Sequence, residues 1–337
     1  MIHIGVDAHM SFCAVYGLDH ATGEVVIEAG HVPTSAAGFA ALFNQPWPDA
    51  QAVVEASGVS MFVVELLSPF VDEVLLADPK VVRQRVRHSR PKTDMADAQE
   101  LAFQLAHGLI HPVFQHTVAG LSLRVLTRAL SWVTGDSTRL RNRIRSLLRQ
   151  FGQRCPRRDL CGLAAQEFLA AITLPEPADM TLRALIEQLL SVQAHRVRLQ
   201  RQLREQARGH ELADLLRTMP GVGIQTAMTL ISEVGDITRF DQVGSFVNYC
   251  GLAPRIEQSG TMRRTGHLIP GNRHLRLALV QAANALGRQK RGETPLHTHH
   301  RALVARRGAK TAKLDTARRI AQVAFTIWRS GEPYRYA

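Results

Sequence analysis

Short apolar runs separated by turn-forming residues dominate the first hundred residues of the chain. Apolar residues alternate with small or polar ones over 2–7, and a second apolar run covers 12–18, which together predict a β-hairpin. β-branched residues predict further strands over 51–54 and 74–77, and the stretch 59–67 has helical periodicity. The pattern therefore predicts a mixed α/β domain in this part of the chain.

Helical periodicity replaces the strand pattern from about residue 110 onward. Residues 121–151 predict one long basic helix. A stripe of apolar residues at heptad-like spacing predicts a helical hairpin or a short coiled coil, formed within one chain or between two copies. The stripe consists of Leu182, Leu185, Leu189, Val192, Leu199 and Leu203.

A Pro-Gly-x-Gly turn lies between two helical stretches in the segment 215–231. This arrangement predicts a helix-hairpin-helix, in which Gly221 and Gly223 leave backbone N–H groups free to meet a phosphate. Turns of this kind also occur in hairpins with a purely structural role.

These patterns predict three regions. The first, 1–112, is an α/β domain. The second, 113–210, is a helical linker with coiled-coil character, and the third, 211–337, is a mostly helical domain that contains the helix-hairpin-helix.

Four carboxylates occupy positions from which they can share a metal ion. Asp7 and Glu55 each end a predicted strand, and Asp94 and Asp97 lie on one face of a helix that Thr93 can cap. Mg²⁺ prefers carboxylate and water oxygens, and a pair of such ions can activate a nucleophile and stabilise the leaving oxygen of a phosphodiester. Each acid taken singly also suits a turn or the first turn of a helix. Because all four occur in this order, we interpret them as a Mg²⁺ or Mn²⁺ site.

The charge balance favours a nucleic-acid partner. The chain carries 41 Lys and Arg against 29 Asp and Glu, a formal charge of +12. Two stretches without an intervening acid concentrate this charge, and arginine forks bind phosphates well. The first contains Lys80, Arg83, Arg85, Arg87, Arg90 and Lys92. The second contains Arg139, Arg141, Arg143, Arg145, Arg149, Arg154, Arg157 and Arg158. We predict nucleic-acid contacts in both, at Arg83, Arg85, Arg87, Arg90, Lys92, Arg139, Arg143 and Arg145.

The sequence argues against a membrane protein and against a zinc site. No apolar run reaches transmembrane length, and the chain begins with a strand in place of a charged signal region, which predicts a cytoplasmic, nucleoid-associated protein. Cys13, Cys155, Cys161 and Cys250 lack paired ligand spacing, so we expect free thiols. The histidine-rich stretch 295–300 predicts a polar loop.

Several stretches resemble, in order and spacing, the DEDD transposases of the insertion-sequence 110 family, which are relatives of the Piv DNA invertase. They are GVDAH, VVEASG, RHSRPKTDMADAQELA, RTMPGVGIQTAMTLISEVGDITRFDQVGSFVNYCGLAPRIEQSG and GHLIPGNRHLRLALVQAA. The resemblance covers nearly the whole chain. It implies an RNase H-like (RuvC-like) α/β N-terminal domain, a linker that carries a coiled coil, and a C-terminal transposase domain.

The resemblance also assigns roles to residues. The acidic tetrad of the family falls on Asp7, Glu55, Asp94 and Asp97, and its nucleophilic serine falls on Ser259. From the residues alone, Ser259 predicts a loop position before a basic segment. Cationic residues around it suit a phosphodiester and the charge of its transition state. They are Arg255, Arg263, Arg264, His267, Arg273, His274 and Arg276.

The reaction and the partners follow from the same resemblance. It implies a site-specific recombinase that cuts donor and target DNA, forms a covalent serine–DNA intermediate and rejoins the strands. It further implies dimers that pair into a tetramer, and a structured bridge RNA whose loops pair with both DNAs. The basic helix predicted over 302–328 either contacts this RNA or packs with a solvated basic face.

Two other classes of function stay open. A RuvC-like junction resolvase needs the four acids but has no use for Ser259. A non-catalytic helix-hairpin-helix protein needs neither.

Overall fold

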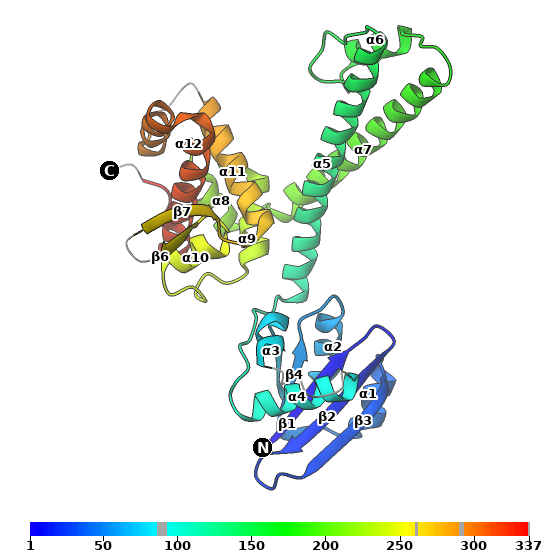
Figure 1. Cartoon of the computed structure of the whole chain (residues 1–337), viewed down its shortest axis with the longest axis vertical. Coiled ribbons are helices and arrows are strands. Elements are labelled where there is room, and N and C mark those ends of the chain that lie inside the picture. Colours follow the sequence, from blue (N-terminus) through cyan, green and yellow to red (C-terminus); the bar gives the residue numbers. More distant parts are fainter. Residues whose placement is uncertain (86–92, 260–261, 290–292, 336–337) are drawn as a thin grey trace. The chain divides into compact units, whose positions relative to one another are not determined.

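The computed structural model describes residues 1–85, 93–259, 262–289 and 293–335, without the side chains of residues 85 and 255–267. It consists of two compact units, Met1–Gln115 and His116–Ala337, whose elements are labelled in Figure 1. The first unit ends close to the predicted boundary at residue 112. The predicted boundary at residue 210 lies inside the second unit and stays a prediction.

A five-stranded sheet in the order β3-β2-β1-β4-β5 forms the centre of the first unit. β1, β2 and β3 are antiparallel neighbours, whereas β4 and β5 run parallel to β1. The strands are β1 (Ile2–Ala8), β2 (Phe12–Asp19), β3 (Val25–Pro33), β4 (Trp47–Glu55) and β5 (Val71–Ala77). The predicted hairpin and the two predicted later strands are confirmed, and β3 is an additional strand that lacks a clear alternating pattern.

The helices of the first unit cover both faces of this sheet. They are α1 (Ala36–Phe43), α2 (Ser60–Leu67), α3 (Pro79–Arg85) and α4 (Asp94–Ala106). Ile4 and Val6 share a buried core with Phe39 of α1 and Val63 of α2. α4 packs on the opposite face, against β1, β2 and β4. Because β1 and β4 are parallel neighbours, their carboxyl ends lie side by side at the same end of the sheet. Binding sites of α/β sheets commonly form at this end.

The second unit is built mainly from helices (Figure 1). They are α5 (Val118–Gln150), α6 (Leu163–Ala171), α7 (Ala178–Gln206), α8 (Glu211–Arg217), α9 (Ile224–Val234), α10 (Val243–Tyr249), α11 (Arg273–Arg288) and α12 (Pro295–Ser330). α5 and α7 pair within the chain, and with α6 they enclose one apolar core around Ile144, Leu148 and Leu189. The other ends of α5 and α7 add Leu130 and Leu203 to a second core among α8–α12. The predicted helical hairpin is therefore present as an intramolecular pair.

Two predictions for the second unit are wrong. The segment that contains Ser259 is a two-stranded antiparallel hairpin, β6 (Pro254–Ser259) and β7 (Met262–Leu268), where we predicted a loop in a helical domain. The histidine-rich stretch lies in α12 instead of a polar loop, because Pro295 begins that helix and His297 is buried. α12 also continues past a non-helical Gly308, whose φ is 76°.

The four cysteines are free, as predicted, and Cys13 and Cys250 are buried. None of the helices in the described part of the chain combines the length and the apolar character needed to span a membrane.

Candidate metal centre and nucleic-acid interface

Gly5 allows α4 to lie directly on β1. A Cβ atom added to Gly5 would stand 2.0 Å from the Ala98 carbonyl oxygen and 2.5 Å from the Ala102 nitrogen, so only glycine permits this approach. Because side chains alternate along a strand, Asp7 faces the same side of the sheet as Gly5. The close packing therefore brings the first turn of α4 beside Asp7.

The N-terminus of α4 carries two further acids of the predicted set of four. Thr93 caps the helix through its Oγ1, which accepts a hydrogen bond from the Ala96 N–H at 3.2 Å. Asp94 and Asp97 lie in the first turn, where a carboxylate interacts favourably with the helix dipole. The capped helix end thus holds both carboxylates at the edge of the sheet.

Asp7 and Asp94 are brought together with a third side chain, His9. One ligand atom from each of the three lies within 4.8 Å of the others. His9 Nε2 lies 3.2 Å from Asp7 Oδ2 and 3.5 Å from Asp94 Oδ1. Of the four predicted acids, the structure thus brings together Asp7 from a strand end and Asp94 from a helix start, whereas Glu55 and Asp97 lie outside this group.

Negative charge accumulates around Asp7. Burial raises the pKa of the Asp7 carboxyl, His9 acts to lower it, and the nearby Asp94 and Asp97 raise it further. Asp97 thus lies close enough to Asp7 to raise its pKa. Among the described residues, however, the group of ligand atoms within 4.8 Å of one another comprises Asp7, His9 and Asp94 without Asp97.

Glu55 ends β4, next to β1. The parallel register pairs Val6 with Val54, so Glu55 follows one residue after the last pair. Val53 packs against Leu101 and Leu105 of α4, and alternation places Glu55 on this same α4 face. Glu55 Oε1 lies 3.7 Å from the Arg83 guanidinium.

His9 is a site residue that our reading of the sequence missed. It follows Asp7 by two residues in the motif GVDAH, just beyond β1. The sequence signal is this short spacing at a strand end, which on its own is too common to identify a ligand.

The side chains present fit a hard divalent cation. Oxygen donors dominate the set, and Mg²⁺ or Mn²⁺ favours carboxylate ligands. Ligand atoms on opposite sides of a Mg²⁺ ion stand about 4 Å apart, so small side-chain movements suffice for the Asp7, His9 and Asp94 atoms. The charge crowding around Asp7 also favours a cation.

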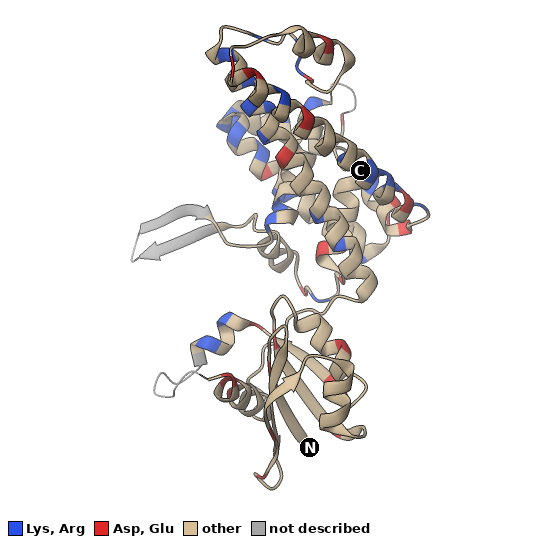
Figure 2. Ribbon diagram, turned by 90° about the vertical axis from the view of Figure 1, so that its right-hand side faces the viewer, with Lys and Arg blue, Asp and Glu red and all other residues tan. Residues whose placement is uncertain are grey.

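Positive charge is distributed unevenly between the two units. In Figure 2, Lys and Arg are spread over many helices of the second unit, whereas in the described first unit they occur in α3 only. The sequence places every Lys and Arg of residues 1–115 between Lys80 and Lys92. Among these, Arg83 is exposed and pairs with Glu55. Arg87, Arg90 and Lys92, and the side chain of Arg85, lie outside the described residues.

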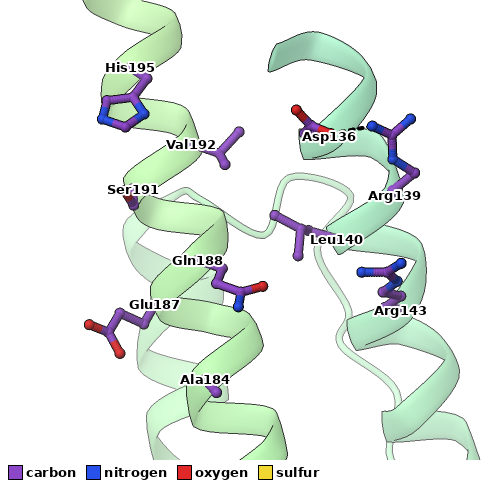
Figure 3. Close-up of a pocket in the computed structure, with 10 residues that line it drawn as sticks. All are labelled: Asp136, Arg139, Leu140, Arg143, Ala184, Glu187, Gln188, Ser191, Val192 and His195. Atoms are coloured by element: carbon purple, nitrogen blue, oxygen red, sulfur yellow. Dashed lines mark hydrogen bonds and ion pairs between the residues drawn. The ribbon is translucent and has the colours of Figure 1, made fainter. Parts of the chain in front are cut away.

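The second predicted basic stretch lies on α5. Arg139 and Arg143 line a groove of about 600 Å³ between α5 and α7. Figure 3 shows Leu140 and Val192 pointing toward each other across this groove, with Arg139 joined to Asp136. Acidic residues also line it, so its charge is mixed.

Gly221 and Gly223 have different roles in the turn between α8 and α9. Gly221 has a φ of 82°, and an added Cβ would meet the Ala282 carbonyl oxygen at 2.4 Å, so it lets the turn pack on α11. Gly223 is the N-cap of α9, where no side chain caps the helix, and an added Cβ there would meet nothing within 4 Å. The backbone at this helix start is thus approachable by a phosphate.

Ser259 is the last residue of β6 and pairs with Met262 of β7. Residues 260–261 and the side chains of Ser259, Arg255, Arg263 and Arg264 lie outside the described part of the structure. After β7, Arg273 is exposed at the start of α11. Arg276 donates to the Ile269 carbonyl oxygen at 3.0 Å.

A buried carboxylate ties together the elements around this hairpin, and our reading of the sequence missed it. Glu233 of α9 is fully buried and accepts hydrogen bonds from Arg124 and Arg128 of α5 and from Asn272, the N-cap of α11. Burial acts to raise the pKa of Glu233, but the hydrogen bonds from Arg128 and Asn272 and the charges of both arginines outweigh it and lower that pKa to about 2. Glu233 therefore stays charged and joins α5 to α11.

Comparison with known proteins gives two family matches. Residues 4–153 match a model of the DEDD transposases of insertion sequence 110, described as "Transposase". Residues 213–297 match a model described as "Transposase IS116/IS110/IS902 family". The first match contains the four acids of the candidate metal centre, and the second contains Ser259.

Individual relatives agree with these matches. The chain is 25% identical over 299 residues to a "Probable family 20 transposase" of Pseudomonas aeruginosa, covering 87% of this chain and 88% of the relative. It is 28% identical over 268 residues to the "Transposase for insertion sequence element IS1111A" of Coxiella burnetii, covering 77% and 72%. A shorter stretch of 73 residues is 37% identical to the "Pilin gene-inverting protein" of Moraxella bovis, covering 21% and 23%.

The acidic end of the sheet and the helical second unit thus occur in a chain of which residues 4–153 and 213–297 both match transposase models. The chain belongs to the IS116/IS110/IS902 family of transposases.

Proposed function

We propose that the chain catalyses metal-assisted cleavage and strand exchange at the ends of an insertion sequence, through a covalent bond between Ser259 and DNA. The observation that carries the metal-dependent part is the convergence of Asp7, Asp94 and His9 at one edge of the sheet. Support for the DNA substrate comes from membership in the transposase family.

Asp7, Glu55, Asp94 and Asp97 hold the divalent cation in this proposal. When bound, Mg²⁺ or Mn²⁺ activates a nucleophile and neutralises charge on the reacting phosphodiester. The ends of β1 and β4 and the first turn of α4 carry these four carboxylates. Asp7 and Asp94 already lie together with His9, whereas Glu55 and Asp97 have to approach them when the cation binds.

The Ser259 hydroxyl oxygen forms a bond to a DNA phosphorus atom while the bond from that phosphorus to a deoxyribose oxygen breaks. The proton that the serine loses is balanced by one that the leaving oxygen takes up to become a hydroxyl. The new serine–DNA phosphodiester preserves the energy of the broken bond for rejoining to another strand. A serine hydroxyl is a weak nucleophile at neutral pH and needs activation, which the bound cation supplies in this proposal. The neighbouring Arg255, Arg263 and Arg264 are proposed to neutralise the phosphate.

Phosphate contacts outside the reacting bond are assigned to the helix start at Gly223 and to the arginines of α3 and α5. We include a dimer or tetramer of the chain, because cutting donor and target DNA together requires two DNA partners in one complex. We also include a bridge RNA as a partner, as the family resemblance implies. Cytoplasmic, nucleoid-associated localisation belongs to the same proposal.

The test is to produce the full chain together with its native flanking DNA and to denature the product in detergent. Mass spectrometry of the Ser259 peptide then detects any attached nucleotide. The proposal predicts an adduct that disappears in Ser259→Ala and in Asp97→Ala. Metal-dependent cutting without an adduct would instead support a hydrolytic junction resolvase, and unchanged DNA binding without any cutting would support a binding protein.

A further inference from the structure

A hollow lined by arginines lies where α5 ends and the chain turns toward α6. Its volume is about 930 Å³, and the buried Leu148 of α5 also lines it. No Asp or Glu is among its lining residues. We call it the arginine hollow, and it contains two arginines of α5, Arg145 and Arg149, and three loop arginines, Arg154, Arg157 and Arg158.

Side chains of α5 hold the loop that carries these arginines. Arg141 Nη2 lies 3.2 Å from Asp159 Oδ1, and Arg145 donates a hydrogen bond to the Arg158 carbonyl oxygen. Leu160 is 1% exposed and lies in the apolar core that α5, α6 and α7 share. The fold itself therefore gathers the arginines before any ligand binds.

In the part of the chain that the structure describes, no carboxylate neutralises the charge of the arginine hollow. Asp159 is the nearest acid along the chain, and Arg141 already pairs with it. The Arg149 guanidinium donates to the Arg145 carbonyl oxygen at 3.1 Å, which leaves its charge uncompensated. Within the described residues, the three loop arginines form no ion pair with a carboxylate. Like charges held together in this way create a positive potential that favours a polyanion.

The chemistry of the lining points to phosphate groups. Arginine presents a planar fork of donors that matches phosphate oxygens. The volume lies at the upper end of the range of about 300–1,000 Å³ for ligand pockets, so more than one phosphate group fits. The lining residues include no aromatic ring on which a base could stack, which favours contact with the backbone over contact with bases. The groove between α5 and α7, by contrast, also contains Asp136 and Glu187.

We propose that the arginine hollow binds the phosphodiester backbone of a nucleic acid, at a site separate from the metal centre. The proposal rests on the nucleic-acid-binding part of the proposed function, but not on the metal chemistry or on Ser259. Within the second basic stretch, it adds the loop arginines to the predicted contacts on α5, which are Arg139, Arg143 and Arg145.

The test uses the full chain in EDTA, so that binding is measured without cleavage. Fluorescence anisotropy gives the affinity for a 40-base-pair mixed-sequence DNA duplex and for a 40-nucleotide RNA hairpin at several KCl concentrations. The variant Arg154→Gln/Arg157→Gln removes two exposed loop arginines that make no ion pair among the described residues. The control Arg198→Gln/Arg204→Gln removes the same charge from exposed positions on α7. Thermal unfolding of each variant checks that the fold is retained.

We expect the loop variant to lose about tenfold or more in affinity relative to the control, for DNA, RNA or both. The slope of log affinity against log salt should fall in magnitude by about 1.4–1.8, because each lost phosphate contact accounts for about 0.7–0.9. Arg154→Lys/Arg157→Lys should restore that slope. A loss for one probe alone identifies that nucleic acid as the ligand.

Two outcomes would overturn the proposal. One is a loss of affinity for both probes no larger than that of the control. The other is a loop variant that loses binding to phosphatidylserine vesicles while it keeps binding to both nucleic acids. These affinities are measured in EDTA without cleavage, so this test does not depend on the metal centre or on Ser259, and the metal chemistry can fail while the arginine hollow still binds nucleic acid.

Discussion

The two units of the chain differ most in charge. Residues 1–115 contain 6 Lys and Arg against 13 Asp and Glu, a formal charge of −7, whereas residues 116–337 contain 35 against 16, a formal charge of +19. Outside the basic stretch between Lys80 and Lys92, the acidic unit repels DNA, so its carboxylates suit a bound cation better than a polyanion. The basic unit supplies the long-range attraction. The overall charge of +12 hides this division. We expect the acidic unit to hold the cation and the basic unit, which also carries Ser259, to supply most of the attraction for DNA.

The largest effect that we expect is a loss of cleavage without a loss of DNA binding, caused by a substitution in the metal centre of the first unit. Asp94→Asn removes a carboxylate from the candidate metal centre, and cleavage of the native flanking DNA should fall about 1,000-fold or more, because the cation contributes several kcal/mol to the reaction. DNA affinity in EDTA should change by less than about threefold. Glu65→Gln removes the same charge from an exposed position on α2 and should cleave normally. Equal losses of binding and cleavage in Asp94→Asn would contradict this division.

The second unit should depend on one buried carboxylate. Glu233→Ala leaves Arg124 and Arg128 without their partner in the interior, and we expect the free energy of unfolding of this unit to fall by about 3–5 kcal/mol. Urea denaturation followed by circular dichroism measures it. Glu167→Ala, at an exposed site on α6, is the control and should change stability by less than about 0.5 kcal/mol. A similar small change in Glu233→Ala would show that the network contributes little.

Acid should destabilise the second unit in two steps. Burial, together with the charges of Arg124 and Arg239, lowers the pKa of His116 from 6.5 to about 4, so the stability that this neutral histidine contributes is present above pH 6.5 and is lost as the pH falls toward 4. Glu233, with its pKa lowered from 4.5 to about 2, contributes stability above pH 4.5 that is lost between pH 4.5 and 2. Each step is about 3 kcal/mol.

Denaturation at a series of pH values, with His116→Gln and Glu233→Gln, assigns the steps. His116→Gln should lack the step between pH 6.5 and 4, and Glu233→Gln should lack the lower one. A pH profile that neither variant alters would contradict both assignments.

The smallest effect should come from Gly5, which acts on the metal centre through packing. Gly5→Ala inserts a methyl group against the backbone of α4, and we expect a loss of about 1–3 kcal/mol in the stability of the first unit together with slower cleavage, because Asp94 moves with the helix. Gly58→Ala is the matched control, since an added Cβ there meets nothing within 4 Å. Wild-type cleavage and stability in Gly5→Ala would show that α4 has room to shift.

Much of the fold follows from local patterns in the sequence. The hairpin of β1 and β2, the Thr93 cap of α4 and the length of α5 are all confirmed, because each depends on alternation, capping or helical periodicity within a short stretch. The hairpin that carries Ser259 was not predicted, since its strands are rich in charged residues and lack an apolar face. The histidine-rich stretch of α12 predicts a loop because its residues are mostly polar, and the burial of His297 follows only from the tertiary packing.

The sequence predicts the acidic residues of the candidate site but not the residues whose roles depend on tertiary contacts. Asp7, Glu55 and the α4 acids carry a signal in their placement at strand ends and at a helix start. His9 and Glu233 do not, because their roles arise from tertiary contacts. The distance from His9 to Asp94 depends on how α4 packs over Gly5. The pairing of Glu233 with Arg124 and Arg128 joins residues more than a hundred positions apart.

The most direct test of the division between an acidic metal-binding unit and a basic DNA-attracting unit is Mn²⁺ binding to the full chain without DNA, measured by electron paramagnetic resonance. We predict that wild type and Glu65→Gln bind Mn²⁺, and that Asp7→Asn and Asp94→Asn bind it at least about tenfold more weakly, because even second-shell changes cost about 10–100-fold in metal affinity. Equal Mn²⁺ affinity in all four proteins would contradict a metal centre at this edge of the sheet.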